Sequence, residues 1–372
     1  MQEPLHFGIV GAGGRGGSFR SAIEAGNARI HAVCDIAPDW LAKAAADLGA
    51  TQTYNDYEQM LDRAGIDAVV IGTPMHLHVP QAVAALERNI HVLCEVTAGV
   101  SVQECRRLVA ACKKSSATYM MAENYCYTKP NTLVRELARL GLFGTPYYAE
   151  GEYLHELKQH NETTPWRRTW QTGIEGVTYG THSLGPILQW MPGDRVARVC
   201  CEGSGHHFND PRGKPYHQDT AVMLCKTVRG ALIKIRVDML SDRPHAMTNY
   251  QLQGTDGCYE SGRGPGEKGK IWLRSLSKQV RWLDVDALMD IEELGSAYLP
   301  EAWRNPPPAA LKSGHGGGDW FEMQDFIRAV RGEMACPVGI YEALDMTLPG
   351  LVSQQSALDG GRWLDVPDSR LW

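Results

Sequence analysis

Short apolar runs alternate with amphipathic segments over the first third of the chain. The runs with the composition of buried strands are Leu5–Val10, Ile30–Cys34, Asp67–Ile71, His91–Cys94 and Thr118–Met121. Helical periodicity lies between them, ending near Ala25 after the first run and then covering residues 39–48, 79–88 and 102–113. Strands that alternate with helices of about ten residues predict βαβ units and an α/β fold with a parallel sheet.

The pattern changes after about Tyr127. Strand-like runs now follow one another, at residues 147–156, 196–202, 221–227, 231–238 and 249–253, with hairpin signals at 228–230 and 254–257. Helical segments are expected at 130–140, 320–331 and 341–358, and loops rich in Gly and Pro at 261–270 and 304–318. This pattern predicts an α+β domain with a large, mostly antiparallel open sheet over residues 127–372, after a first domain over residues 1–126.

A glycine-rich loop joins the first strand to the first helix. Its motif is Gly11-x-Gly13-x-x-Gly16, with Gly14 and Arg15 inside it. In this strand–loop–helix context, glycines let the backbone approach a pyrophosphate, and the helix N-terminus supplies N–H donors. Asp35 ends the second strand, where a carboxylate binds the ribose hydroxyls and repels the 2′-phosphate of NADP. We therefore expect a doubly wound Rossmann domain that binds NAD; a glycine turn without a ligand is the alternative.

Charge and composition exclude several classes of binding partner. The net charge of -6 leaves no basic surface for nucleic acid or an anionic membrane, and no apolar run reaches the ~20 residues of a membrane helix. The ten cysteines include no CxxC pair, and the start of the chain has no secretory pattern, so we expect reduced thiols and a cytoplasmic protein. His206, His207, His217 and Asp219 match no zinc spacing, so no metal is expected.

The order of the elements resembles the Gfo/Idh/MocA oxidoreductases. The residues that carry the resemblance are Gly72–His78 and Cys94-Glu95, each of which follows a strand. Dehydrogenases of that family have a Lys after this Glu and an Asp four residues before a catalytic His. Here Val96 replaces the Lys, and Thr178 stands four residues before His182. The two departures argue against simple dehydrogenase chemistry.

The departures resemble a particular branch, the NAD-dependent α-N-acetylgalactosaminidase type of glycosidase. The shared segments are residues 120–127, 141–144, 151–157, 166–170, 178–186, 243–244 and 314–317. The resemblance implies further cofactor-binding residues, namely Thr73, Pro74, His76, His78, Glu95, Asn124, Trp166 and Arg167. For His76 and His78, a helix-capping role is the alternative. The substrate-binding residues that it implies are Tyr125, Tyr153, His155, Trp170, Arg243 and His315.

The resemblance also implies a reaction without net oxidation or reduction. Sugar C3 is oxidised transiently, the C1 leaving group is eliminated after loss of the C2 proton, water adds, and the hydride returns. Proton transfer then falls to His182 and Tyr179, supported by Tyr153 and His155; the alternative for the first pair is a buried, hydrogen-bonded structural role. The alternative functions are an NAD-dependent sugar or cyclitol dehydrogenase and a non-catalytic NAD-binding sensor. The expected assembly is a homo-oligomer, a dimer or tetramer formed through the C-terminal sheet.

Overall fold

A computed structural model describes residues 3–213, 216–244, 247–264, 266–277, 279–290 and 298–372. Its contacts divide the chain into two compact units. The first unit holds Met1–Thr128, Pro307–Leu344 and Ser369–Trp372, and the second holds Lys129–Pro306 and Asp345–Asp368. The sequence suggests one boundary after residue 126, whereas here the first unit also takes up two segments from late in the chain.

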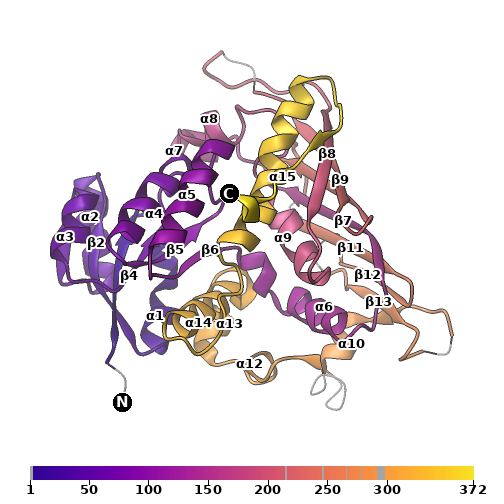
Figure 1. Ribbon diagram of the computed structural model, residues 1–372, viewed down its shortest axis with the longest axis horizontal. Coiled ribbons are helices and arrows are strands. Elements are labelled where there is room, and N and C mark those ends of the chain that lie inside the picture. The colour runs from indigo at the N-terminus through magenta and orange to yellow at the C-terminus, as the bar shows by residue number, and fades with distance from the viewer. Residues whose placement is uncertain (1–2, 214–215, 245–246, 265, 278, 291–297) are drawn as a thin grey trace. The chain divides into compact units, whose positions relative to one another are not determined.

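The first unit is built on a parallel sheet with the order β3-β2-β1-β4-β5-β6 (Figure 1). Its strands are β1 (Leu5–Val10), β2 (Ala28–Cys34), β3 (Gln52–Tyr54), β4 (Ala68–Ile71), β5 (His91–Glu95) and β6 (Tyr119–Ala122). The strand order reverses between β1 and β4, and in a doubly wound sheet ligands bind at the carboxyl ends of the strands at such a point. The structure thus confirms the predicted Rossmann fold.

Helices connect these strands and cover the sheet. They are α1 (Arg20–Ala25), α2 (Pro38–Leu48), α3 (Tyr57–Arg63), α4 (His78–Glu87) and α5 (Val102–Lys114), together with the late helices α13 (Pro308–Lys312) and α14 (Gly318–Val330). Helix α14 packs against α1, and its Phe326 meets Phe7 of β1 edge to face, with ring centroids 6.1 Å apart. A segment from late in the sequence therefore completes the core beside the first strand.

Three elements of this unit differ from the prediction. Strand β3 and helix α3 were not predicted, because a three-residue edge strand and a seven-residue helix have too few apolar positions to show a period. Asp56 caps α3 by accepting a hydrogen bond from the Gln59 backbone N–H at 2.9 Å. The loop predicted at 304–318 is wrong in part, since it contains α13, which begins with a proline in its first turn.

The second unit contains a nine-stranded sheet with the order β14-β13-β12-β11-β7-β10-β9-β8-β15. Its strands are β7 (Pro146–Leu154), β8 (Val196–Gly203), β9 (Thr220–Thr227), β10 (Leu232–Asp238), β11 (Thr248–Gly254), β12 (Gly257–Glu260), β13 (Lys270–Leu273), β14 (Leu283–Asp284) and β15 (Leu364–Asp365). Neighbours are antiparallel except for β7 and β10, which confirms the mostly antiparallel sheet. Both predicted hairpins form, between β9 and β10 and between β11 and β12.

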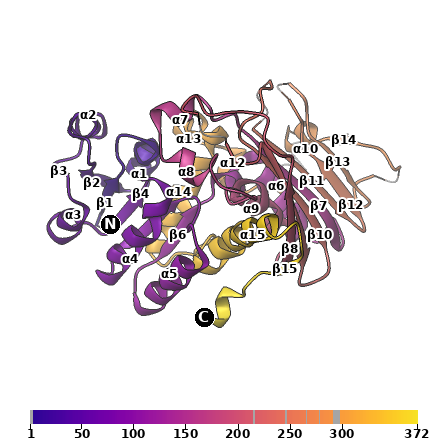
Figure 2. The same ribbon diagram turned by 90° about the horizontal axis from the view of Figure 1, so that it is seen from above.

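Helices α6 (Lys129–Arg139), α9 (Thr181–Trp190) and α15 (Ile340–Leu358) lie on one face of this sheet (Figure 2). Gly151 of β7 allows α9 to pack closely, because a Cβ there would collide with the Ser183 carbonyl oxygen. Trp190, at the end of α9, meets Tyr250 and Tyr259 edge to face. The remaining helices are short: α7 (His160–Thr163), α8 (Arg167–Trp170), α10 (Val285–Asp290) and α12 (Glu301–Arg304).

Candidate active site

The glycine loop of the first unit is held by close backbone contacts. Gly11 has a φ of +74°, which favours glycine, and a Cβ on it would lie 2.7 Å from the Gly72 carbonyl. A Cβ on Gly72, in turn, would lie 2.5 Å from the Gly16 nitrogen. Side chains are therefore excluded at the point where the ends of β1 and β4 meet the start of the first helical turn, Arg15–Phe19.

Asp35 faces this loop from the end of β2. Its carboxylate accepts hydrogen bonds from the backbone N–H groups of Gly13, at 3.2 Å, and Ala37, at 3.0 Å. The following residue, Ile36, is 89% exposed and carries no charge. A fixed carboxylate beside a glycine cradle, with no cation next to it, fits the adenosine ribose of NAD.

Arg15, predicted to bind the cofactor, points its guanidinium at carboxylates of its own unit. Its Nη1 and Nη2 lie 2.6 Å from the two Asp319 carboxylate oxygens, and its Nε lies 2.9 Å from Glu95 Oε1. Burial alone would lower the pKa of Arg15, but Glu95 and Asp319 outweigh burial and raise it. Asp319 was not predicted as a site residue, because an acidic residue in the first turn of a helix has the pattern of ordinary helix polarity.

The segment after β4 contains Thr73, Pro74, His76 and His78. His78 is buried, and its Nδ1 and Nε2 lie 2.8 Å from the Thr97 carbonyl oxygen and 2.9 Å from the Thr73 carbonyl oxygen. Burial lowers the pKa of His78. The neutral ring has one N–H and donates to one of these two carbonyls, which holds His78 between the two loops. Its contact with the cofactor stays a prediction. His76 lies in a short 3-10 turn, Met75–Leu77, and remains a predicted cofactor neighbour.

Three more predicted residues come together in the first unit. Asn124 and Tyr125 begin a 3-10 turn after β6, and His315 precedes α14. His315 Nδ1 lies 3.1 Å from Asn124 Nδ2, and its ring meets Tyr125 edge to face at 5.6 Å. The structure thus brings a predicted cofactor residue and two predicted substrate residues together across 191 positions of sequence.

The four predicted catalytic residues form one cluster in the second unit. The Tyr153 ring centroid lies 5.1 Å from that of His182 and 5.7 Å from that of Tyr179, and the Tyr179 and His182 centroids are 5.3 Å apart. The Tyr153 hydroxyl lies 2.8 Å from His155 Nδ1. Helix α9 starts at Thr181, so His182 stands in its first turn and Tyr179 in the turn before it.

The environment of this cluster corrects one expectation and adds a residue. The strand predicted at 147–156 is shorter than expected, because β7 ends at Leu154; Tyr153 lies inside it and is 6% exposed, and His155 follows its end. His160 was missed, although its ring lies 5.7 Å from that of His155. A lone His in a polar segment gives no periodic signal, so only the fold reveals this neighbour. The cluster offers imidazole and phenol groups, which are side-chain types that act as general acids and bases.

Trp166, Arg167 and Trp170 lie on and next to the short helix α8. Arg167 Nη1 donates to Gln171 Oε1 at 2.6 Å, and its Nε donates to Thr164 Oγ1 at 2.9 Å. Its guanidinium also lies 4.6 Å from the centre of the Trp166 ring. These contacts hold Arg167 within its own segment, and its predicted role toward the cofactor stays a prediction, as does the role of Trp170.

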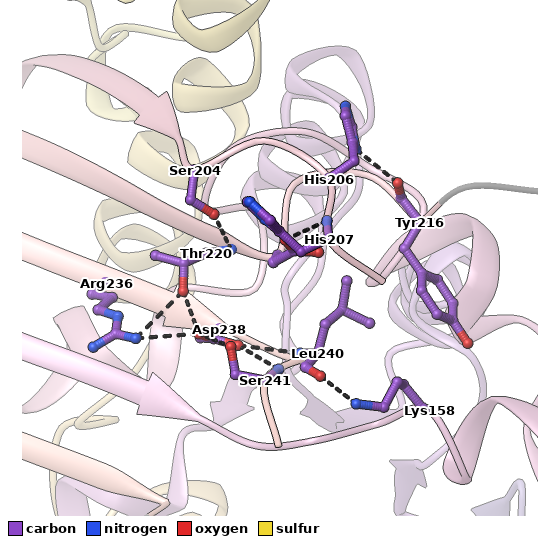
Figure 3. Close-up of polar contacts among 11 residues, drawn as sticks. Lys158, Ser204, His206, His207, Tyr216, Thr220, Arg236, Asp238, Leu240 and Ser241 are labelled. Atoms are coloured by element: carbon purple, nitrogen blue, oxygen red, sulfur yellow. Dashed lines mark hydrogen bonds and ion pairs between the residues drawn. The ribbon is translucent and has the colours of Figure 1, made fainter. Parts of the chain in front are cut away.

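Arg243 is exposed in the segment that follows β10. Figure 3 shows how Asp238, at the end of β10, anchors the start of this segment by accepting from Ser241 Oγ at 2.7 Å and from the Leu240 backbone N–H at 3.2 Å. Thr220 and Arg236 bind the same carboxylate. The buried Asp238 thus sets the turn that leads to Arg243, whose substrate contact stays a prediction.

The histidines considered for a metal have separate partners. His206 Nδ1 lies 2.9 Å from the Tyr216 carbonyl oxygen (Figure 3). His207 Nδ1 lies 2.6 Å from Asp219 Oδ2. His217 pairs instead with Glu175. Within the residues that the structure describes, no three His, Cys, Asp or Glu side chains form a group that could hold a metal ion. The two positions that depart from the dehydrogenase pattern, Val96 and Thr178, are both buried.

A Rossmann unit with a glycine cradle and a ribose-facing carboxylate, followed by an α+β unit with an imidazole–phenol cluster, defines an NAD-binding enzyme of the oxidoreductase fold. Residues 5–123 match the oxidoreductase family with an NAD-binding Rossmann fold. Residues 127–370 match the C-terminal domain of glycosyl hydrolase 109. The chain belongs to glycosyl hydrolase family 109.

Relatives support this assignment. A glycosyl hydrolase family 109 protein of Saccharopolyspora erythraea is 28% identical, over 98% of this chain and 83% of its own. An alpha-N-acetylgalactosaminidase of Shewanella oneidensis is 27% identical, over 98% and 85%. A levoglucosan dehydrogenase in complex with NADH and levoglucosan has a TM-score of 0.81 at 21% identity, covering 98% of this chain and all of the other. This last likeness shows the fold.

In the described ranges, no helix is both long and apolar enough to cross a bilayer.

Proposed function

We propose that this protein is an NAD-dependent glycosidase that cleaves a glycoside by transient oxidation at C3 and elimination across C1 and C2. The observation that carries the proposal is the cluster of Tyr153, Tyr179 and His182 with His155. Glycosidases that work through an oxocarbenium-like transition state use a pair of carboxylates. Imidazole and phenol groups instead suit removal of a weakly acidic C–H proton next to a carbonyl group. The names of the family 109 relatives support a carbohydrate substrate.

In this proposal, the glycine loop and Asp35 would hold NAD, which when bound would supply a hydride acceptor for the oxidation of C3 and a hydride donor for its reversal. His182 takes the proton of the C3 hydroxyl, so that a ketone forms. Tyr179 takes the proton from C2, which the neighbouring ketone makes acidic, and the C1–O bond then breaks with its electron pair on the leaving oxygen. Water adds to the resulting enone with its oxygen at C1 and a proton at C2, and the leaving oxygen gains a proton from solvent in place of the one that Tyr179 took. A hydride at carbon and the proton held by His182 at oxygen then restore the C3 hydroxyl. The net change is hydrolysis.

Val96 supports this proposal over a net oxidation. A dehydrogenase of this fold places a Lys there to carry the hydroxyl proton, whereas Val96 is apolar and 5% exposed. The proton of the reacting hydroxyl then falls to a group of the second unit, and we assign it to His182. Glu95, directly before Val96, is paired with Arg15 rather than with a lysine.

The deciding experiment is hydrolysis in D2O. A panel of aryl glycosides and aryl thioglycosides is incubated with the purified protein, and released aglycone, NADH absorbance and deuterium in the sugar are followed together. We expect aglycone release, one deuterium at C2 and no net NADH. Tyr179→Phe should slow C2 exchange by roughly 100-fold or more, as loss of a general base does. Tyr147→Phe is the matched control, because Tyr147 is 51% exposed on the neighbouring strand β7.

Stoichiometric NADH with an intact glycosidic bond and no label at C2 would establish the dehydrogenase alternative. Release of aglycone without label at C2 would point to direct displacement and remove the role assigned to Tyr179. Nucleotide binding with neither reaction on the panel would leave the sensor alternative in its place.

We also propose a cytoplasmic homo-oligomer formed through the sheet of the second unit. The sheet face opposite α9 carries Glu150 of β7 and Lys234 of β10, which are paired in register and bound to each other. With side-chain exposures of 34% for Lys234 and 16% for Glu150, this pair is partly shielded from solvent, and a two-fold interface would place the same patch of both subunits in contact. None of the ten cysteines, all of which lie in the described ranges, forms a disulfide, which fits a reducing compartment. Light scattering coupled to gel filtration gives the assembly, with a Lys234→Glu variant expected to shift it toward the monomer.

A further inference from the structure

His315 is fixed by an unusual stretch of backbone that we name the His315 loop, residues 314–318. Three consecutive residues of this loop have positive φ: His315 at 54°, Gly316 at 63° and Gly317 at 97°. A positive φ is uncommon for a residue other than glycine and persists only where contacts hold it. The loop runs directly into α14, so the imidazole sits one turn away from Asp319.

Asp319 is the contact that holds this imidazole. It is fully buried, and its Oδ1 lies 2.9 Å from His315 Nδ1. The same carboxylate takes both Nη groups of Arg15 at 2.6 Å, in the two-pronged geometry that guanidinium and carboxylate favour. Burial would raise the pKa of Asp319, but the hydrogen bonds from His315 and Arg15 outweigh it and lower the pKa to about 2. The carboxylate is therefore ionised at neutral pH.

An ionised oxygen at 2.9 Å decides which ring nitrogen carries the proton. If Nδ1 held a lone pair, that lone pair would face a negative oxygen; with a proton, it donates a charge-assisted hydrogen bond. The Asn124 amide also touches Nδ1, at 3.1 Å, and its oxygen has no hydrogen-bond partner in the described part of the chain. Amide orientation follows from the network, and the orientation with oxygen toward Nδ1–H satisfies this second acceptor too.

The opposite nitrogen of the ring is left for a ligand. Among the described residues, none contacts His315 Nε2, and the side chain is 31% exposed. Tyr125 closes one side of the ring edge to face. An imidazole whose Nδ1 carries the proton presents a lone pair at Nε2, which accepts a hydrogen bond from a hydroxyl group.

We infer that Asp319 is a positioning residue that holds His315 as its Nδ1–H tautomer, so that Nε2 accepts a hydrogen bond from a sugar hydroxyl. The inference rests on the proposed function for the nature of this ligand, whereas the tautomer itself does not depend on it. Arg15 takes part by fixing Asp319 from the glycine loop. The nucleotide-binding loop and the His315 loop are thus joined through one buried carboxylate.

Asp319→Asn tests the inference because it replaces the hydrogen-bond acceptor that faces His315 Nδ1 with a donor. The oxygen of an asparagine turns to the Arg15 guanidinium, which needs an acceptor, and its NH2 group then faces His315 Nδ1. We therefore expect the Nε2–H tautomer in this variant, as happens when an aspartate that orients a catalytic histidine is replaced by asparagine. Asp325→Asn is the matched control, since Asp325 lies on the same helix and pairs with Arg328 at 3.6 Å.

The tautomer is read from 15N resonances of the full-length protein labelled at histidine, at about pH 9, well above the ordinary imidazole pKa of ~6.5. The His315→Asn variant identifies the resonances. We expect a protonated Nδ1 and an unprotonated Nε2 in the wild type, and the reverse in Asp319→Asn. A wild-type Nε2–H tautomer, or no change in the variant, would overturn the inference. Arg15→Lys is the second variant, expected to weaken the Nδ1–H preference without removing the carboxylate.

Kinetics separate this inference from the proposed function. On an aryl glycoside that is cleaved, kcat/KM should fall roughly 10–100-fold in Asp319→Asn, the usual cost of removing the partner that orients an imidazole. Asp325→Asn should leave it unchanged. Equal kcat/KM in Asp319→Asn and wild type would overturn the role of His315 toward the sugar. If no glycoside is cleaved, the proposed function fails, while the tautomer measurement still decides the role of Asp319.

Discussion

Glu322 on α14 is a buried acid whose charge the protein disfavours. Its side chain is fully buried, and both carboxylate oxygens lack a hydrogen-bond partner among the described residues. Burial, followed by the charges of Asp319 and Glu95, raises its pKa well above the ordinary value of 4.5. Arg15 Nη2, 4.0 Å from Glu322 Oε1, acts in the other direction, but its charge is already shared between two closer carboxylates. We therefore expect Glu322 to keep its proton in the folded protein.

This proton makes stability fall as pH rises. Above about pH 4.5 the unfolded chain releases the proton and the folded protein retains it, so the unfolded state binds fewer protons. The free energy of unfolding then decreases by about 1.4 kcal/mol for each pH unit over which the folded carboxyl stays protonated. Glu322→Gln keeps the shape and removes the titration. The stability of the variant relative to wild type should therefore grow with pH at this slope.

The assay is urea unfolding at several pH values from 5 to 8 for wild type, Glu322→Gln and the control Glu87→Gln. Glu87 is exposed near the end of α4. The test is how the difference in free energy of unfolding between variant and wild type changes with pH. Any difference in packing between Gln and protonated Glu adds the same amount at every pH and does not affect this change. The difference between Glu322→Gln and wild type should rise with pH, and that for the control should stay flat. Parallel curves for wild type and Glu322→Gln would show that Glu322 is ionised and that the argument from burial is wrong.

Three further predictions concern the cofactor loop and the reaction. Asp35→Asn should weaken NAD binding by about 1–3 kcal/mol, because a charged acceptor is lost, and should reduce the preference for NAD over NADP. Calorimetry with both nucleotides measures these affinities. An unchanged NAD affinity would contradict the assignment of Asp35 to the ribose. Gly72→Ala should destabilise the protein by roughly 1–3 kcal/mol, since its Cβ would lie 2.5 Å from a backbone nitrogen of the glycine loop; a wild-type melting temperature would argue against this packing. His182→Ala should lower turnover at least ~100-fold, whereas Val96→Ala should change it less than about tenfold; equal losses would remove His182 as proton carrier.

The sequence alone determined the parts of this protein that depend on local pattern. Alternating strands and helices, the glycine loop and Asp35 all lie within one βαβ stretch, so spacing predicts both the Rossmann fold and the NAD site. Strands β7 to β11 of the second unit and its two hairpins also follow from alternation and turn residues. The resemblance of short motifs to the glycosidase branch also predicted Tyr179 and His182, which are three residues apart, as site residues. The structure places both next to Tyr153.

The tertiary structure decided which distant groups share an environment. Asp319 and Arg15 are 304 positions apart, and in the sequence each has an ordinary local explanation, as a helix-start acid and as a loop cation. Two-residue edge strands such as β14 and β15 form only because a neighbouring strand offers unpaired backbone groups. The same long-range packing buries Glu322, whose carboxylate has no hydrogen-bond partner among the described residues, and sets both ring nitrogens of His78 against backbone carbonyls. The burial and the pairing of a side chain depend on residues that are distant in sequence but close in space. The pattern of residues along the chain does not contain these spatial distances.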